Sequence, residues 1–119
     1  MVLVETTVFD GDDLRRTDPK FLEPRFAQYL TAVGKLDQLA RKRFGKRVIQ
    51  LAVRWMLDQG ITSALWGARR PEQLQAVDAV SGWSLDASAK AEVDRILRDT
   101  IDDPVGPEFM APPARGATA

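Results

Sequence analysis

A short apolar segment bounded by glycines constrains the fold of this chain more than any other feature. Residues Ile61 to Trp66 lie between Gly60 and Gly67. If they form a strand, the side chains on both of its faces are apolar or small. Such a run is typical of a strand buried on both faces, as in a parallel sheet. A strand satisfies its backbone N–H and C=O groups only by pairing. The sequence therefore predicts a strand at 61–66 that needs partner strands.

The rest of the sequence has mostly helical patterns. Apolar residues recur on one face from Phe26 to Phe44, and a nearly all-apolar helix follows as far as Gly60. Proline and glycine positions mark the ends of further helices. We expect helices at residues 24–45, 46–59, 71–82 and from about 86 onward, and a strand or extended lead-in at 2–9. One clear strand among several helices gives a chain that is helix-rich in isolation.

The order helix, glycine, buried strand, glycine, helix is the repeating unit of a barrel or a doubly wound sheet. The strands that would flank 61–66 are not evident elsewhere in this sequence. The fold class is therefore α/β, and the sequence predicts that this chain is part of a larger sheet architecture.

Composition limits the classes of partner. The 119 residues are enough for one domain, and 45% hydrophobic with 29% charged residues is a globular balance. Seventeen basic and seventeen acidic residues cancel, so no overall field draws the chain to nucleic acid or to an anionic membrane. The basic run from Arg41 to Arg47 precedes a helix that is too apolar to lie in a DNA groove. We expect no nucleic-acid partner.

The chain has no Cys and no His. Disulfides and thiolate chemistry are therefore excluded, and the commonest metal ligands and general bases are missing. The first residues lack the pattern of a signal peptide. The longest apolar stretch, 48–57, is interrupted by Gln50 and Arg54 and is far short of the ~20 residues that span a bilayer. We expect a cytoplasmic protein without a membrane segment.

Two adjacent segments carry a resemblance to a known family. Residues 47–60, RVIQLAVRWMLDQG, followed by residues 61–74, ITSALWGARRPEQL, are similar to aldo/keto reductases in order and spacing. The resemblance extends upstream through FDGDDLRRTDPKF at 9–21 and downstream to DPVGPEFMAPP at 103–113. It covers about residues 9–113, and leaves 1–8 as an unmatched lead-in and 114–119 as a mobile tail.

The resemblance implies the C-terminal part of a (β/α)8 TIM barrel. It also implies a parent activity, the NADPH-dependent reduction of an aldehyde or ketone without a metal, in which NADP(H) carries the hydride. In that family the end of the eighth strand meets the adenosine phosphate of the cofactor. The matching residues here are Gly67, Ala68, Arg69, Arg70 and Gln73.

These residue types suit a phosphate. Arg69 and Arg70 lie between a predicted strand end and a predicted helix start at Pro71, where free N–H groups favour an anion. Arginine binds phosphate bidentately, and two small residues let a nucleotide approach the backbone. From the pattern alone, a solubilising surface role of the two arginines is favoured over phosphate binding. The resemblance to the family reverses this order and favours phosphate binding. Ala76 and Val77 replace an acidic residue and an Asn that contact adenine in relatives, so adenine contacts are not carried over.

No catalytic residue is assigned. The catalytic Asp, Tyr, Lys and His of the resembling family have no counterparts here, and Tyr29 lies in a helical pattern that favours packing. The loop at 10–20 has two interpretations, and both stay open. It either closes over a cofactor or substrate or forms a solvated, salt-bridged loop. The charged residues concerned are Arg15, Arg16, Lys20, Asp12, Asp13 and Asp18. The three tryptophans favour packing, with Trp66 at the strand end nearest the site.

Whether the chain is itself an enzyme stays open. The first hypothesis is a partial aldo/keto reductase that supplies the adenosine-phosphate site, with NADPH and a small carbonyl compound as ligands of the complete enzyme. The alternative is a non-catalytic helical module that forms homo-oligomers or binds a protein through the apolar surface that a barrel would cover.

Overall fold

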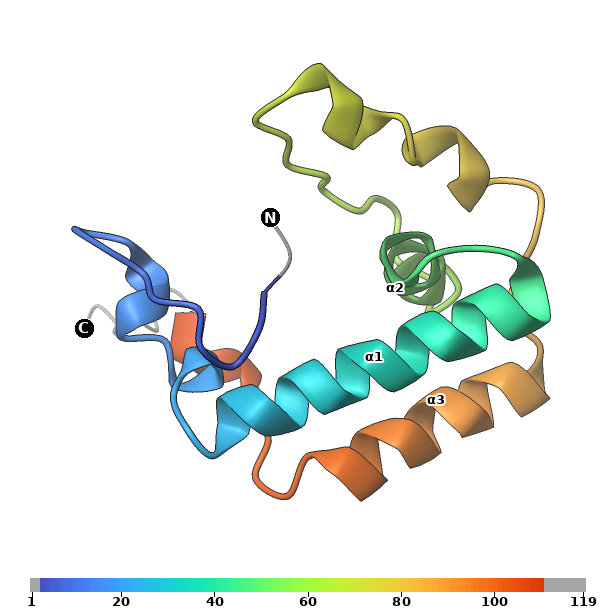
Figure 1. Cartoon of the computed structure of the whole chain (residues 1–119). Helices are drawn as coiled ribbons and strands as arrows, with labels where there is room; N and C mark the ends of the chain where they lie inside the picture. Colours follow the sequence, from blue (N-terminus) through green and yellow to red (C-terminus); the bar gives the residue numbers. More distant parts are fainter. Residues whose placement is uncertain (1–2, 111–119) are drawn as a thin grey trace, which may run out of the picture.

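The computed structural model describes residues 3–110, and three α-helices dominate this part of the chain (Figure 1). They are α1 (Arg25–Phe44), α2 (Val48–Leu57) and α3 (Ala87–Thr100). Short 3-10 helices are η1 (Leu14–Arg16), η2 (Pro19–Phe21), η3 (Pro71–Leu74), η4 (Val77–Val80) and η5 (Pro107–Met110). In Figure 1, α1 and α3 lie side by side in opposite directions, and α2 crosses them and is seen end-on.

Helix α1 confirms the expected helix at 24–45. It ends at Gly45, whose left-handed φ of 62° is strained for residues with a Cβ. The N–H of Gly45 donates to Arg41 O at 3.1 Å, and the N–H of Lys46 donates to Ala40 O at 3.1 Å. These bonds satisfy carbonyls that the last turn would leave free. The chain can therefore turn sharply into α2.

The N-terminus of α2 is fixed by a side chain of α1. Asp37 accepts a hydrogen bond from the backbone N–H of Val48 at 2.9 Å, and the N–H of Arg47 donates to Gln50 Oε1 at 2.8 Å. Hydrogen bonds from Arg41 and then from Val48 lower the pKa of Asp37. The carboxylate thus joins two helices and satisfies a free donor of the second.

Replacing Asp37 with alanine is expected to lower the free energy of unfolding by about 1 kcal/mol, because the α2 N-terminus loses its cap. The lowered pKa makes this stabilisation complete above the unfolded-state pKa of about 4. It is lost as the pH falls through the folded-state value. Urea unfolding at pH 7 and pH 3 measures both effects. Gln38→Ala, at an exposed neighbouring position, is the control, and equal losses in the two variants would contradict the capping role.

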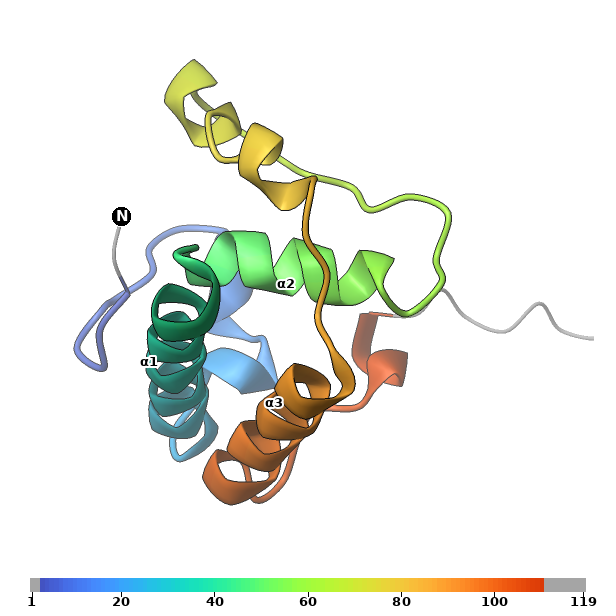
Figure 2. The same ribbon diagram turned by 90° about the vertical axis from the view of Figure 1, so that its right-hand side faces the viewer.

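The core lies where the three helices meet. Figure 2 shows them around a common interior. The buried cluster consists of Leu39, Ala40, Leu51, Leu85, Ala89 and Val93, with Leu36, Phe44, Trp55, Trp83 and Ile96 packed against it. The Trp83 ring lies 4.8 Å from the Phe44 ring, and its Nε1 donates to Ala79 O at 2.7 Å. The packing role predicted for Trp55 and Trp83 is therefore confirmed.

One side of this interior is open and apolar. A hollow of about 210 Å³ lies between the three helices and is lined by Leu36, Val48, Leu51, Ala52, Trp55, Met56, Val93 and Leu97. Although α2 is apolar on nearly every side, it is not buried all round, because Ala52 is exposed and Ile49 is 42% exposed. Nothing in residues 3–110 covers this face of α2.

The segment 71–82 forms two 3-10 turns, η3 and η4, instead of the single short helix expected. Its side chains are mostly exposed. Val80 is the buried residue of η3 and η4. Two side chains of α2 hold it: Arg54 Nη1 donates to Val80 O at 3.2 Å, and Gln50 Nε2 donates to Ala76 O at 3.4 Å. Because Leu74 and Val77 stay 49% and 41% exposed, the segment has no packed apolar face that would stabilise a regular helix.

Asp58, just after α2, ties the third helix to the second. Its Oδ1 lies 2.9 Å from Arg54 Nη2, and its Oδ2 accepts the N–H of Leu85 at 2.8 Å. Asp86 then caps α3 by accepting the N–H of Ala89 at 2.7 Å. The predicted helix start near residue 86 is confirmed, and Leu85 is buried just before it.

The strand expected at 61–66 is not formed within residues 3–110, and this prediction is corrected. The segment has no regular secondary structure and is unpaired, and Leu65 is 98% exposed. The physical reason is the one that the sequence indicates: the described part of the chain contains no second strand to accept its backbone bonds. The strand or extended lead-in expected at 2–9 instead contains a turn, closed by Thr7 N–H donating to Val4 O at 2.9 Å.

The segment after α3 folds back onto the start of α1. Tyr29 Oη accepts the N–H of Val105 at 3.1 Å, and Arg25 Nε donates to Asp103 O at 2.8 Å. Lys20 Nζ lies 5.2 Å from the centre of the Phe109 ring. Tyr29 thus has the packing role predicted for it. The tail predicted at 114–119 lies outside the described residues.

Candidate functional site

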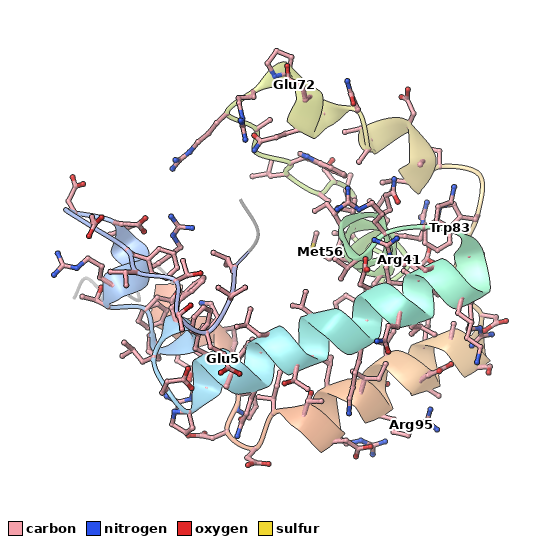
Figure 3. The ribbon with its side chains drawn as sticks, in the orientation of Figure 1. Glu5, Arg41, Met56, Glu72, Trp83 and Arg95 are labelled. Atoms are coloured by element: carbon pink, nitrogen blue, oxygen red, sulfur yellow. The ribbon has the colours of Figure 1, made fainter. Side chains whose placement is uncertain are left out.

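The predicted site residues lie on an arc that stands away from the helices. Residues 61–70 leave α2 in an open curve and lead into η3 and η4, which form the top of the molecule in Figure 1. Glu72, labelled in Figure 3, lies at the top of this arc, away from the N-terminal loop. An open depression of about 860 Å³ lies between the arc and the N-terminal segment, lined by Leu3, Arg15, Arg69, Arg70 and Gln73. Three of the predicted site residues therefore face one space.

Gln73 shapes the turn that presents the two arginines. Its Oε1 accepts the backbone N–H of Arg69 at 2.7 Å and that of Arg70 at 3.2 Å. One oxygen therefore holds two consecutive amides and draws residues 69–73 into a tight loop. The side-chain amide nitrogen keeps its two donors for a ligand.

Gly67 and Ala68 precede this loop, and both are exposed and outside any regular secondary structure. A Cβ built on Gly67 would meet no atom within 4 Å, so packing within this chain does not require glycine there. The small side chains leave the backbone open to a molecule that approaches the depression.

The expected helix start at Pro71 does not supply the positive charge. Element η3 is a 3-10 helix of four residues and is followed by a turn, so few peptide dipoles are aligned. The attraction for an anion has to come from the guanidinium groups themselves. This corrects the dipole argument made from the sequence.

A third arginine reaches the same depression from the charged loop. Arg15 pairs with Asp13 through Nε, at 2.9 Å from Oδ1, and through Nη2, at 2.5 Å from Oδ2. The pKa of Asp13 is lowered to about 2, chiefly by hydrogen bonds from the Arg15 side chain and backbone, and the charge of Arg69 makes a small contribution to this lowering. The carboxylate of Asp13 therefore lies within electrostatic reach of arginines from both segments.

The other residues that the sequence pointed to as candidates lie outside the depression. Arg16 Nη1 donates to Gly11 O, and Lys20 Nζ pairs with Asp18 at 2.9 Å. Neither Arg16, Lys20 nor Trp66 lines the depression. The loop is thus salt-bridged, as one interpretation predicted, and its Arg15 lines the depression. Closure of the loop over a cofactor stays a prediction. The predicted site did not include Arg15, although the resemblance of the loop at 9–21 was the signal that pointed to it.

Residues 2–98 match the model of the Aldo/keto reductase family. This chain belongs to the aldo/keto reductase family. The fold of that family is a (β/α)8 barrel, and the resemblance seen in the sequence is confirmed.

Curated relatives of this aldo/keto reductase chain are bacterial. It is 57% identical over 114 residues to aldo-keto reductase YhdN of Bacillus subtilis (strain 168), covering 95% of this chain and 34% of the relative. It is 32% identical over 92 residues to L-glyceraldehyde 3-phosphate reductase of Escherichia coli (strain K12), covering 76% of this chain and 25% of the relative.

A solved structure shows the same arrangement. Glycerol dehydrogenase AKR11B4 from Gluconobacter oxydans matches with a TM-score of 0.79 and 50% identity, over 92% of this chain and 33% of that one. The chain thus spans about a third of the length of the relatives it matches most fully. No helix in residues 3–110 is long and apolar enough to cross a membrane.

Proposed function

We propose that this chain provides the adenosine-phosphate site of a reductase that transfers hydride from NADPH to a small aldehyde or ketone. The residues that bind are Gly67, Ala68, Arg69, Arg70 and Gln73. Family membership supports the class of reaction, and the cofactor would supply the hydride itself. The role of this chain is to bind and orient the adenosine end of the cofactor.

The observation that carries this proposal is the convergence of Arg69 and Arg70 on one open depression, presented by a loop that Gln73 holds together. NADP(H) differs from NAD(H) by one phosphate on the adenosine ribose. A guanidinium pair matches the oxygens of that phosphate in charge and geometry. The arrangement therefore favours NADP(H) over NAD(H).

Catalysis of the reduction needs groups from outside the described residues. Tyr29 is engaged with the backbone of Val105 and lies in α1, remote in sequence from the arginine loop. No group of three or more acidic, Cys or His side chains in residues 3–110 could hold a metal. We assign the chain a binding role and no catalytic residue.

The test is a titration of the purified chain with NADPH and with NADH, followed by cofactor fluorescence. Arg69→Ala is expected to weaken NADPH binding about tenfold and to change NADH binding less than about twofold, because one charge-assisted contact is worth about 1.5–3 kcal/mol. Arg95→Ala is the control, because Arg95 is an exposed arginine of α3 whose pairing with Glu92 is loose, at 3.8 Å. Equal loss of both cofactors in Arg69→Ala would contradict the proposed role.

A second candidate function rests on the apolar hollow between α1, α2 and α3. In a helical module without a barrel, this face would bind another protein or a second copy of the chain. Light scattering on the titrated sample distinguishes the two functions. A stable oligomer that binds neither cofactor would favour the module, whereas saturable NADPH binding favours the cofactor site.

A further inference from the structure

We propose that Gln50 and Arg54 of α2 are positioning residues for the arginine loop 69–73, because they hold the backbone of η4 and so determine where the loop lies. This inference rests on the proposed function, since the position of the loop affects binding only if the loop binds the cofactor. Neither side chain lines the depression. Their effect on a ligand therefore passes through the residues that join the loop to η4.

The polar side chains of α2 lie in one row, on the side that faces the arc. Gln50 and Arg54 are the two polar residues of an otherwise apolar helix, and a spacing of four residues places them on the same face. Figure 1 and Figure 2 both show the arc on one side of α2, with α1 and α3 on the other. Gln50 is 8% exposed, whereas the apolar Ile49 is 42% exposed. The polar side chains of this helix thus serve contacts within the chain.

Two hydrogen bonds from this row hold both ends of η4. Gln50 Nε2 donates to the carbonyl oxygen of Ala76, the N-cap of η4, at 3.4 Å. Arg54 Nη1 donates to the carbonyl oxygen of Val80, the last residue of η4, at 3.2 Å. The two acceptors are spaced by four residues, as the two donors are, so η4 runs alongside α2 in the same direction. The bonds therefore define both the place and the direction of η4.

Burial alone would hold this segment loosely. Val80 is 5% exposed, but Leu74 and Val77 stay 49% and 41% exposed. One buried side chain fixes a single point of a short turn and leaves its direction free. Two directional bonds at opposite ends of the turn fix its direction as well. The contacts from α2 are thus suited to orient what is attached to η4.

The arginine loop is attached directly to this turn. Ala76 is three residues after Gln73. Gln73 Oε1 accepts the backbone N–H groups of Arg69 and Arg70, and the N–H of Gln73 donates to Arg70 O at 3.1 Å. A shift of Ala76 is therefore passed to Gln73 and from there to both arginines. Binding groups have to be held within about 0.5 Å of their productive geometry, so a small shift is enough to weaken a contact.

Gln50→Glu separates this role from the capping of α2. The side chain has two uses, because its Oε1 accepts the N–H of Arg47 at 2.8 Å while its Nε2 donates to Ala76 O. A carboxylate at this third position of the helix keeps the acceptor for Arg47 and is favourable near a helix N-terminus. It has no donor for Ala76 O. Gln38→Glu, the same change at an exposed position of α1, is the matched control.

Arg54→Lys tests the second bond and guards against a folding defect in Gln50→Glu. Arg54 Nε donates to Asp58 Oδ1 at 3.0 Å while Nη1 donates to Val80 O. An ammonium group keeps the charge beside Asp58, but it has no planar fork that makes both contacts. We therefore expect Arg54→Lys and Gln50→Glu to change the loop in the same way.

The position of the loop is measured without any cofactor, by limited digestion with trypsin. The bond after Arg69 lies inside the loop, and the bond after Arg16, another exposed arginine, is the internal reference. Cleavage follows the population of locally open states, and global unfolding would expose both bonds. We expect Gln50→Glu and Arg54→Lys to raise the ratio of cleavage after Arg69 to cleavage after Arg16 about fivefold, and Gln38→Glu to change it less than about twofold. An unchanged ratio in the first two variants would overturn the inference.

Titration with NADPH tests whether the position of the loop matters for binding. We expect Gln50→Glu to weaken NADPH binding to the full chain about fivefold, and Gln38→Glu to change it less than about twofold. In a chain that already carries Arg69→Ala, Gln50→Glu should weaken binding by less than about twofold further, because Gln50 acts through the loop. Additive losses would overturn the inference, since they would show that Gln50 acts independently of Arg69.

The outcomes also separate this inference from the proposed function. If Arg69→Ala weakens NADPH binding while Gln50→Glu changes neither binding nor the cleavage ratio, the cofactor site stands and the positioning role fails. If the unchanged chain binds neither NADPH nor NADH, the proposed function fails, and the cleavage ratio alone decides the positioning role. A raised ratio then supports it, and an unchanged ratio overturns it.

Discussion

Replacing Asp58 with alanine is expected to lower the free energy of unfolding by about 3 kcal/mol. The side chain is only 12% exposed, and it pairs with Arg54 at 2.9 Å while accepting the N–H of Leu85 at 2.8 Å. Its loss leaves a largely buried guanidinium without its carboxylate and a backbone donor without an acceptor. Arg54 also holds Val80 O, so the connection from α2 to the arc that carries the arginines is loosened as well.

Urea unfolding followed by circular dichroism measures this loss. Asp94→Ala is the matched control, because Asp94 is an exposed aspartate on α3, and a surface change of this kind stays within about 0.5 kcal/mol. A loss in Asp58→Ala no larger than that in Asp94→Ala would show that the Arg54–Asp58 pair does not connect the elements.

Leu85→Ala is expected to lower the free energy of unfolding by about 3 kcal/mol, because it opens a cavity in the main core cluster. Leu85 is 5% exposed and immediately precedes the cap of α3. Leu74→Ala, the same change at a 49% exposed position in η3, is expected to cost less than about 0.5 kcal/mol. The same urea experiment gives the loss of unfolding free energy for both variants. Similar losses in Leu85→Ala and Leu74→Ala would contradict the burial of Leu85 in the core cluster.

The elements that were predicted correctly depend on local signals. Gly45 ends α1 because a left-handed residue is needed there, and Asp86 starts α3 because its carboxylate accepts the N–H of Ala89. Asp37 and Gln50 fix the start of α2 within a few residues of the basic run. The signals at Gly45 and Asp86 act over a few residues, so they are visible in the sequence. The contact of Asp37 with Val48 crosses the turn between α1 and α2 and was not predicted.

The errors arise where structure depends on distant partners. The strand at 61–66 has the right composition, but pairing decides whether a strand forms, and the described residues contain no partner. The segment 71–82 has apolar residues at helical spacing but little neighbouring surface on which to bury them. Tertiary context is stronger than local preference in both cases.

The residues that line the depression were predicted in part, because only some of them are close together in the sequence. The arginine loop is contiguous, so Gly67 to Gln73 could be singled out from their order and from the resemblance. Arg15 reaches the depression through the stack of Phe9, Phe21 and Phe26 and through the pair with Asp13. Its approach to residues 69–73 needs the folded loop, and neither spacing nor charge alone shows it.

The unpaired stretch at 61–68 also bears on how this protein stays in solution. It carries no charged residue, it is rich in apolar side chains, and its backbone donors and acceptors make no regular pairing. Exposed edges of this composition act as templates for cross-β association with identical segments of other molecules. Closure of the barrel in the complete domain would enclose the same residues between neighbouring strands. Completing the fold would then serve colloidal stability as well as cofactor binding.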